Sequence, residues 1–220
     1  MKLKVFLFII LALIMVSEYG AICCFLADDD ESGSSYPPDN PSHLVAVCVS
    51  KSQVNLFWID ESHDEDKFVI EREIGPSDSY AEVARTNAGI ESYSDTGLTS
   101  ETLYYYRIRA YNHDGGCSGP SNEVPVMTFL NEPTGLTSTA ISATQIDISW
   151  TDNSSKEDGF KIERKEGLAG TYTQIDAVLS GITSYSDISL TSGITYYYRV
   201  KAYCTSASSI YSGETNATTY

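Results

Sequence analysis

The sequence predicts an all-β chain of two tandem β-sandwiches with about seven strands each, preceded by a hydrophobic export segment. Three observations carry this prediction. The 220-residue chain matches itself at a shift of 92, as from Trp58 to Trp150. Short stretches of alternating polar and apolar residues lie between clusters of turn residues, which is typical of strands. Beyond the amino-terminal stretch, no segment shows a sustained helical period.

The self-match covers most of both halves of the chain in one register, so it indicates an internal duplication. The matched positions include Pro41 and Pro133, Trp58 and Trp150, residues 70–72 and 162–164 (both Ile-Glu-Arg), residues 93–95 and 185–187 (both Tyr-Ser-Asp), and residues 104–107 and 196–199 (both Tyr-Tyr-Tyr-Arg).

The strands follow from alternation inside each repeat. In the second repeat, Ile146, Ile148 and Trp150 are separated by single polar residues, so they share one face of a strand. Residues 198–202 alternate in the same way, and residues 151–155 form a polar turn cluster between such stretches. We therefore expect one buried and one exposed face for each sheet.

Composition and repeat together divide the chain into four parts. Residues 1–24 are a signal peptide or membrane anchor, and residues 25–40 are a flexible acidic Ser/Pro-containing linker. Residues 41–129 form the first repeat, and residues 130–220 form the second.

The amino terminus has the pattern of an export signal, with a basic start followed by an unbroken apolar run over residues 5–16. Three fates are open. Signal peptidase cleaves near Cys23, or a lipoprotein peptidase modifies Cys23 or Cys24. Otherwise residues 5–27 stay uncleaved as an anchor, because they are long enough to span a bilayer. We favour cleavage.

The charge balance excludes one class of partner. Fourteen Lys and Arg against 30 Asp and Glu give a formal net charge of −16. So acidic a surface repels nucleic acid and anionic lipid head groups. We expect no nucleic-acid partner, and contact with a membrane only through the amino-terminal segment.

At these residues the chain resembles the fibronectin type III family, in the form common in bacterial extracellular proteins. The pattern is a Trp, an Asp two residues on, an aromatic-x-Ile-Glu-Arg strand, then Tyr-x-Asp-x-x-Leu and a Tyr six residues after that Leu. The resemblance covers roughly residues 41–220. It implies an immunoglobulin-like sandwich in which the family's core and tyrosine-corner positions are Trp58, Trp150, Leu98, Leu190, Tyr104 and Tyr196. Members of the family are spacers, adhesive modules, receptor parts and accessory modules of polysaccharide-degrading enzymes, so the fold does not give the activity.

One strand of each repeat carries an aromatic-basic stripe on its outward face. The stripe consists of Tyr105, Arg107, Arg109 and Tyr111 in the first repeat and Tyr197, Arg199, Lys201 and Tyr203 in the second. It is either a ligand-binding face or a cross-strand ladder with Glu71 beside Arg107 and Glu163 beside Arg199. We favour the ladder.

Two loops of the first repeat are candidates for a metal site. They are expected at the same pole of the sandwich and together offer imidazole, carboxylate and thiol ligands. The candidate ligands are His63, Asp64, His113, Asp114 and Cys117, whereas the second repeat has Ser155, Thr205 and Ser206 at positions matching His63, His113 and Asp114. A solvated acidic loop end is the simpler interpretation, and we favour it.

No sequence motif for a nucleophile, a phosphate-binding loop or a zinc protease is present. We therefore expect a chain that is not an enzyme and needs no cofactor. The favoured function is that of an extracellular binding or spacer protein, secreted or held at the cell surface, with an extracellular protein or polysaccharide as partner. The alternatives are a structural self-assembly or adhesion component, and an accessory carbohydrate-binding partner of a glycan-processing system.

Intact-mass analysis of the protein recovered from the cell envelope or the medium tests the export signal. We expect a mature chain that begins between about residues 20 and 27. A chain beginning at Cys23 or Cys24 with added acyl mass would show a lipoprotein instead, and a full-length chain in the membrane fraction would show an anchor.

Overall fold

The computed structural model describes residues 36–77 and 79–220, and every element within them is a β-strand. The all-β prediction is therefore confirmed. The predicted signal or anchor over residues 1–24, Cys23, Cys24 and most of the linker over residues 25–40 lie outside the described residues. A search of the described part of the chain found no helix with the length and apolar character needed to cross a bilayer.

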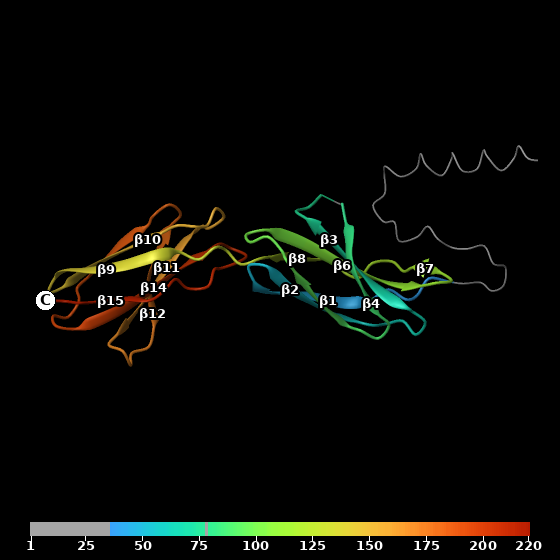
Figure 1. Cartoon of the computed structure of the whole chain (residues 1–220), viewed down its shortest axis with the longest axis horizontal. Coiled ribbons are helices and arrows are strands. Elements are labelled where there is room, and N and C mark those ends of the chain that lie inside the picture. Colours follow the sequence, from blue (N-terminus) through green and yellow to red (C-terminus); the bar gives the residue numbers. More distant parts are fainter. Residues whose placement is uncertain (1–35, 78) are drawn as a thin grey trace, which may run out of the picture. The chain divides into compact units, whose positions relative to one another are not determined.

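The first sandwich consists of two antiparallel sheets. One has the strand order β1-β2-β5, and the other has the order β4-β3-β6, with β7 and β8 both pairing with β6 (Figure 1). The strands are β1 (Ser42–Ser50), β2 (Gln53–Ile59), β3 (Lys67–Ile74), β4 (Ala81–Asn87), β5 (Ser92–Thr96), β6 (Leu103–Asn112), β7 (Gly116–Cys117) and β8 (Val124–Met127).

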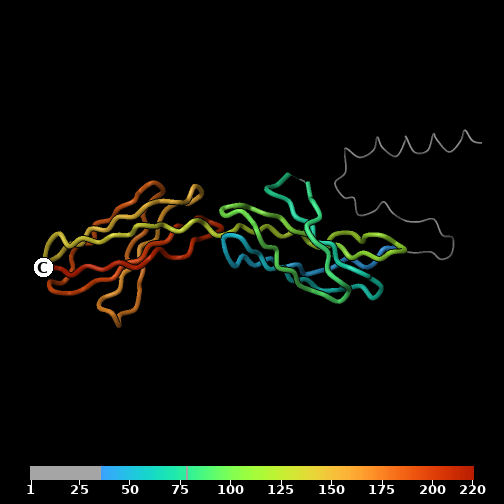
Figure 2. The backbone as a smooth tube through the Cα atoms, in the orientation of Figure 1, coloured from blue at the N-terminus to red at the C-terminus, as the bar shows by residue number. Residues whose placement is uncertain are grey.

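The second sandwich repeats this plan with the sheet orders β13-β10-β9 and β12-β11-β14-β15. Its backbone runs from yellow to red in Figure 2. The strands are β9 (Thr134–Ser142), β10 (Gln145–Thr151), β11 (Gly159–Glu166), β12 (Thr173–Leu179), β13 (Ser184–Ile188), β14 (Thr195–Tyr203) and β15 (Thr215–Thr218).

The 92-residue register changes after the sixth strand. Ser118 accepts a hydrogen bond from the backbone N–H of Ala110, and Ser209 does the same for Ala202. Ser118 and Ser209 are 91 positions apart, whereas Ala110 and Ala202 are 92 apart. The second repeat is therefore one residue shorter in the loop after β14, and later positions match at a shift of 91.

Each sandwich has its core between its two sheets. Trp58 packs edge-on against Phe68 with 5.5 Å between ring centroids, and Trp150 packs against Phe160 with 5.6 Å. Both tryptophans are buried, as the sequence predicted. Leu130 is fully buried in the core of the second sandwich. The boundary between residues 129 and 130 stays a prediction.

An ion pair with a buried carboxylate joins the two sheets of the second sandwich. Asp187 on β13 accepts hydrogen bonds from Nη1 of Arg164 on β11, at 2.9 and 2.8 Å to its two oxygens. The hydroxyl of Tyr198 on β14 donates to the same carboxylate at 2.8 Å. Since a buried carboxylate needs such partners, these contacts fix how β13 faces the other sheet.

Trp150→Ala should destabilise the second sandwich by about 3–5 kcal/mol, as expected for removal of a buried aromatic side chain. The variant leaves Trp58 as the sole tryptophan, so its fluorescence reports the first sandwich alone. We expect the midpoint temperature of the fluorescence transition to stay near that of the first sandwich in the wild-type chain. Circular dichroism should show a separate transition of the second sandwich at a lower temperature. A shared shift of both signals would show that the two repeats do not unfold independently.

Candidate binding face

The aromatic-basic stripe lies on one face of its strands, as the alternation predicted. On β6 the side chains of Tyr105, Arg107, Arg109 and Tyr111 are half-buried, while the residues between them are buried. The same holds on β14 for its four stripe residues. The stripe therefore lies on the outward face of the sheet, opposite the core.

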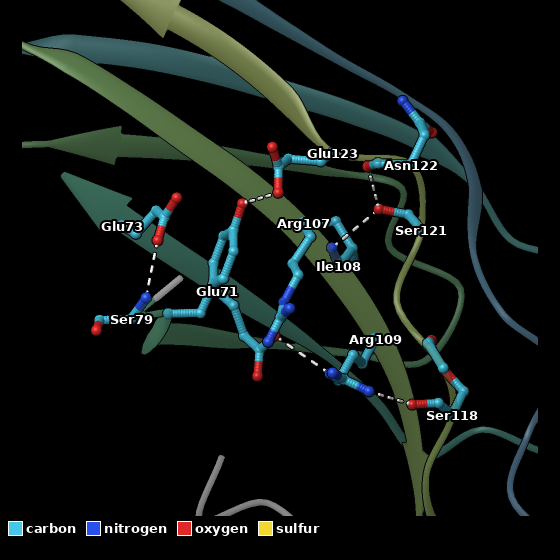
Figure 3. Close-up of polar contacts among 12 residues, drawn as sticks. Glu71, Glu73, Ser79, Arg107, Ile108, Arg109, Ser118, Ser121, Asn122 and Glu123 are labelled. Carbon is cyan, nitrogen blue, oxygen red and sulfur yellow. Dashed lines mark hydrogen bonds and ion pairs between the residues drawn. The ribbon is translucent and has the colours of Figure 1, made fainter. Parts of the chain in front are cut away.

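In the first sandwich a buried carboxylate holds the stripe cations. Glu71 on β3 stands directly opposite Arg107 on β6, and its side chain is only 3% exposed. Its Oε2 is 2.5 Å from Nε of Arg107 and 3.2 Å from Nε of Arg109. Figure 3 shows Glu71 beside both arginines. The predicted pairing of Glu71 with Arg107 is confirmed.

An aromatic ring covers the Arg107 guanidinium. The Cζ atom of Arg107 is 3.9 Å from the ring centroid of Tyr80, a cation–π contact. The Tyr80 hydroxyl donates to Glu123. Burial raises the pKa of Tyr80, and the hydrogen bond to Glu123 raises it further, so the phenol stays protonated. Arg109 is held from its other side, because its Nη1 donates to the backbone oxygen of Ser118 at 2.8 Å.

In the second sandwich two aromatic rings enclose the matching arginine. The Cζ atom of Arg199 is 4.1 Å from the ring centroid of Tyr172 and 3.8 Å from that of Tyr211. Nε and Nη2 of Arg199 donate to Oε2 of Glu163 at 2.8 and 2.6 Å. The hydroxyl of Tyr211 donates to the other oxygen of Glu163. The predicted pairing of Glu163 with Arg199 is therefore also confirmed.

Hydrogen bonds and charge act against burial at Glu163. Burial alone raises the pKa of this carboxyl, but the Tyr211 hydrogen bond and the Arg199 ion pair lower it overall. The ladder continues to Lys165, whose Nζ is 3.1 Å from Glu214 and 4.7 Å from the Tyr172 ring centroid.

The two ladders differ at one aromatic position. Tyr211 matches Pro120 at the shift of 91, so Arg107 lacks a second ring at that position. Arg199 is thus bound between two tyrosines, and Arg107 is bound by Tyr80 on one side.

The ladder limits what the stripe offers to a ligand. The side chains of Arg107 and Arg109 are 20% and 19% exposed, and that of Arg199 is 31% exposed. All three have a carboxylate or carbonyl partner within the sandwich. The cross-strand ladder therefore accounts for these cations, and ligand binding by the stripe stays a prediction.

The candidate metal ligands do not form a metal-binding group. Across residues 36–77 and 79–220, no three His, Cys, Asp or Glu side chains are arranged to hold a metal ion. Asp64 instead accepts hydrogen bonds from Ser62 and Asn112, and His63, His113 and Asp114 are exposed. Cys117 has its sulfur in a disulfide.

Two of the matching residues in the second repeat contact other parts of the chain. Ser155, which matches His63, donates its backbone N–H and its hydroxyl to Glu101. Ser206, which matches Asp114, donates to the sulfur of Met127 at 3.6 Å. The hydroxyl residues at the matching positions of the second repeat therefore have hydrogen-bond partners of their own.

The predicted tyrosine corner is confirmed in the second repeat. The hydroxyl of Tyr196 accepts a hydrogen bond from the backbone N–H of Thr191 at 3.1 Å. Tyr104, its counterpart, is buried, as are Leu98 and Leu190. These positions support the fold rather than a binding site.

The residues that complete the ladder could not be predicted from the alternation of the strands. Tyr80 and Tyr172 match at the shift of 92, and the chain has 16 Tyr against 7 Phe, but neither signal gives a partner. Tyr211 lies 48 positions from Glu163, Glu123 lies 43 from Tyr80, and Glu214 lies 42 from Tyr172.

Comparison with known proteins gives the fold but no single function. A two-domain fibronectin type III segment of chicken tenascin aligns with 82% of this chain and all of that chain, at a TM-score of 0.51 and 20% sequence identity. The protein therefore has the fold of tandem fibronectin type III domains. No family model matches the chain.

Sequence relatives include proteins of different kinds. Exoglucanase B of Cellulomonas fimi is 33% identical over 132 residues, which are 54% of this chain and 11% of that protein. Chitinase A1 of Niallia circulans is 28% identical over 181 residues, or 73% of this chain and 25% of that protein. The tyrosine-protein phosphatase Lar of Drosophila melanogaster is 29% identical over 118 residues, or 51% of this chain and 6% of that protein. The chain thus spans a quarter or less of each of these relatives.

Glu163→Gln should weaken the second sandwich in a pH-dependent way. Because the folded-state pKa of Glu163 is lowered, its contribution is complete above about pH 4.3, the usual pKa of an unfolded Glu, and is lost as the pH falls through the folded-state value. We expect the variant to lose about 1.5–3 kcal/mol of unfolding free energy at pH 7 and much less at pH 3.

Urea unfolding followed by Trp150 fluorescence, in a Trp58→Phe background, measures this difference. Glu166→Gln is the matched control, because Glu166 lies at the exposed end of the same strand. An equal loss at both pH values would contradict an ionised Glu163 as the centre of the ladder.

Proposed function

We propose that the chain is a non-catalytic extracellular module that acts mainly as a spacer, exported through its amino-terminal segment. The observation that carries this proposal is the ladder on the outward sheet face of both sandwiches. Polar and charged groups there bind one another within the sandwich, as Glu71 binds Arg107 and Glu163 binds Arg199.

A spacer needs sheets that stay folded in an exposed setting. Arginine stacked on tyrosine and paired with a shielded carboxylate adds to stability without an added apolar surface. The high negative charge also favours solubility. Both features suit a module that keeps other parts of a system apart and does not bind a ligand through this face.

A second candidate is an accessory carbohydrate-binding role in a glycan-processing system. It is favoured by the similarity to parts of an exoglucanase and of a chitinase, and by aromatic rings on the outward face, since flat rings can stack on sugars. Tyr105 and Tyr197 would be the residues to test, because they lie on this face and are half-buried.

Sedimentation with insoluble cellulose and with chitin separates the two roles. We expect the wild-type chain to show no saturable binding to either polymer. Saturable binding that is lost in the Tyr105→Ala/Tyr197→Ala double variant would overturn the spacer role and support the accessory one. Digestion by protease added to intact cells tests the location: a chain that stays protected until the cells are broken would contradict an extracellular module.

A further inference from the structure

Glu101 has a backbone conformation that is unusual for its residue type. Its φ of 56° lies in the left-handed region, which L side chains rarely adopt and glycine adopts readily. The matching residue of the second repeat is Gly193, with φ of 74°. A glutamate thus stands in the turn between β5 and β6 where the other repeat has the residue that suits this conformation. Backbone outliers of this kind cluster at sites with a specific role, so the contacts of the Glu101 side chain are of interest.

The side chain of Glu101 accepts three hydrogen bonds from two segments. Oε1 accepts the backbone N–H of Asn131 at 2.9 Å. Oε2 accepts the backbone N–H of Ser155 at 3.1 Å and its hydroxyl at 3.0 Å. These residues belong to one compact unit, which is made of Val47–Asn55, Ser94–Leu103 and Val126–Tyr220.

The Glu101 carboxylate makes these hydrogen bonds despite repulsion from two neighbouring acidic residues. Asp152 and Glu157 lie on the same loop as Ser155, and both interact electrostatically with Glu101. Burial raises the pKa of Glu101, yet the hydrogen bonds from Asn131 and Ser155 lower it overall. The three donors therefore outweigh both burial and the two neighbouring acids.

A second ion pair lies in the same compact unit. Nζ of Lys51, in the turn between β1 and β2, is 2.8 Å from Glu132. The backbone oxygen of Glu132 accepts a hydrogen bond from the side chain of Asn153. Within this unit, the turns at Lys51 and at Glu101 thus contact the segment 131–132 and the loop 152–158 at separate points.

We propose that Glu101 is a latch that fastens the loop over residues 152–158, and the segment at Asn131, to the turn over residues 97–102. Glycine would relieve the backbone but would supply no acceptor, so the latch requires an acidic side chain in a conformation that disfavours it. The latch also explains why the second repeat has Ser155 where the first has His63: a short hydroxyl residue donates twice to the carboxylate. This role does not depend on the proposed spacer function.

Amide hydrogen exchange on the whole chain tests the latch. In Glu101→Gly the amides of Asn131 and Ser155 lose a charged acceptor, and we expect them to exchange about tenfold faster or more. The midpoint of thermal unfolding should stay equal or rise, because glycine suits the left-handed backbone. Faster exchange at these two amides, without a lower midpoint of thermal unfolding, cannot result from a general loss of stability.

Ser189→Gly is the matched control. Ser189 is also a non-glycine residue with a left-handed backbone, at φ of 62°, and its counterpart in the first repeat is Gly97. This variant should relieve the backbone in the same way and leave the exchange of Asn131 and Ser155 unchanged. If both amides exchange at the wild-type rate in Glu101→Gly, or equally fast in both variants, the latch is refuted.

Tryptic cleavage gives a second measurement on the intact protein. Lys156 is an exposed residue of the latched loop, so release of the loop should speed cleavage after Lys156 in Glu101→Gly but not in Ser189→Gly. Cleavage there at the same rate in all three proteins would contradict the proposal.

Discussion

The buried carboxylate of Asp187 is the group on which the second sandwich depends. It is only 4% exposed, and an unpaired charge at such a site would be strongly destabilising. Arg164 and Tyr198 supply its partners from the opposite sheet. Burial raises the pKa of Tyr198, and the hydrogen bond to Asp187 raises it further, so the phenol stays a donor. These contacts therefore constrain the register in which β11 and β14 present Arg164 and Tyr198 to Asp187.

That register also determines the outward face. When Tyr198 points into the core, its neighbours Tyr197 and Arg199 must point outward, because side chains alternate along a strand. Arg199 then lies opposite Glu163 on β11, and the ladder follows from the same alignment that satisfies Asp187. The inward ion pair and the outward ladder are two consequences of one pairing between β11 and β14.

The sequence was sufficient for the parts of this arrangement that depend on alternation and on neighbouring strands. It predicted the sandwiches, the buried Trp58 and Trp150, and the pairing of Glu71 with Arg107, since each needs only the strand period and one pairing. It could not predict the contribution of Tyr211, because that contact depends on how the chain between β14 and β15 returns over the sheet. The described residues hold no group of three His, Cys, Asp or Glu side chains arranged for a metal ion, and the contact of Ser155, which matches His63, with Glu101, 54 positions away, was likewise outside the reach of the sequence.

The two repeats keep the acid and the arginine at the centre of each ladder and differ at other positions, as where Glu73 matches Lys165. Glu71 and Glu163 are both acids, and each binds the arginine opposite it. Two of the differences fall at positions with a left-handed backbone. At residue 101 the first repeat has an acid for the glycine at position 193, and at residue 43 it has a histidine for the glycine at position 135, all four with positive φ. A glycine at such a position satisfies only the backbone, whereas a side chain there can make a contact that offsets the strain. For Glu101 that contact is with Ser155 in the loop over residues 152–158. Divergence between the copies is therefore a guide to what each copy does beyond folding.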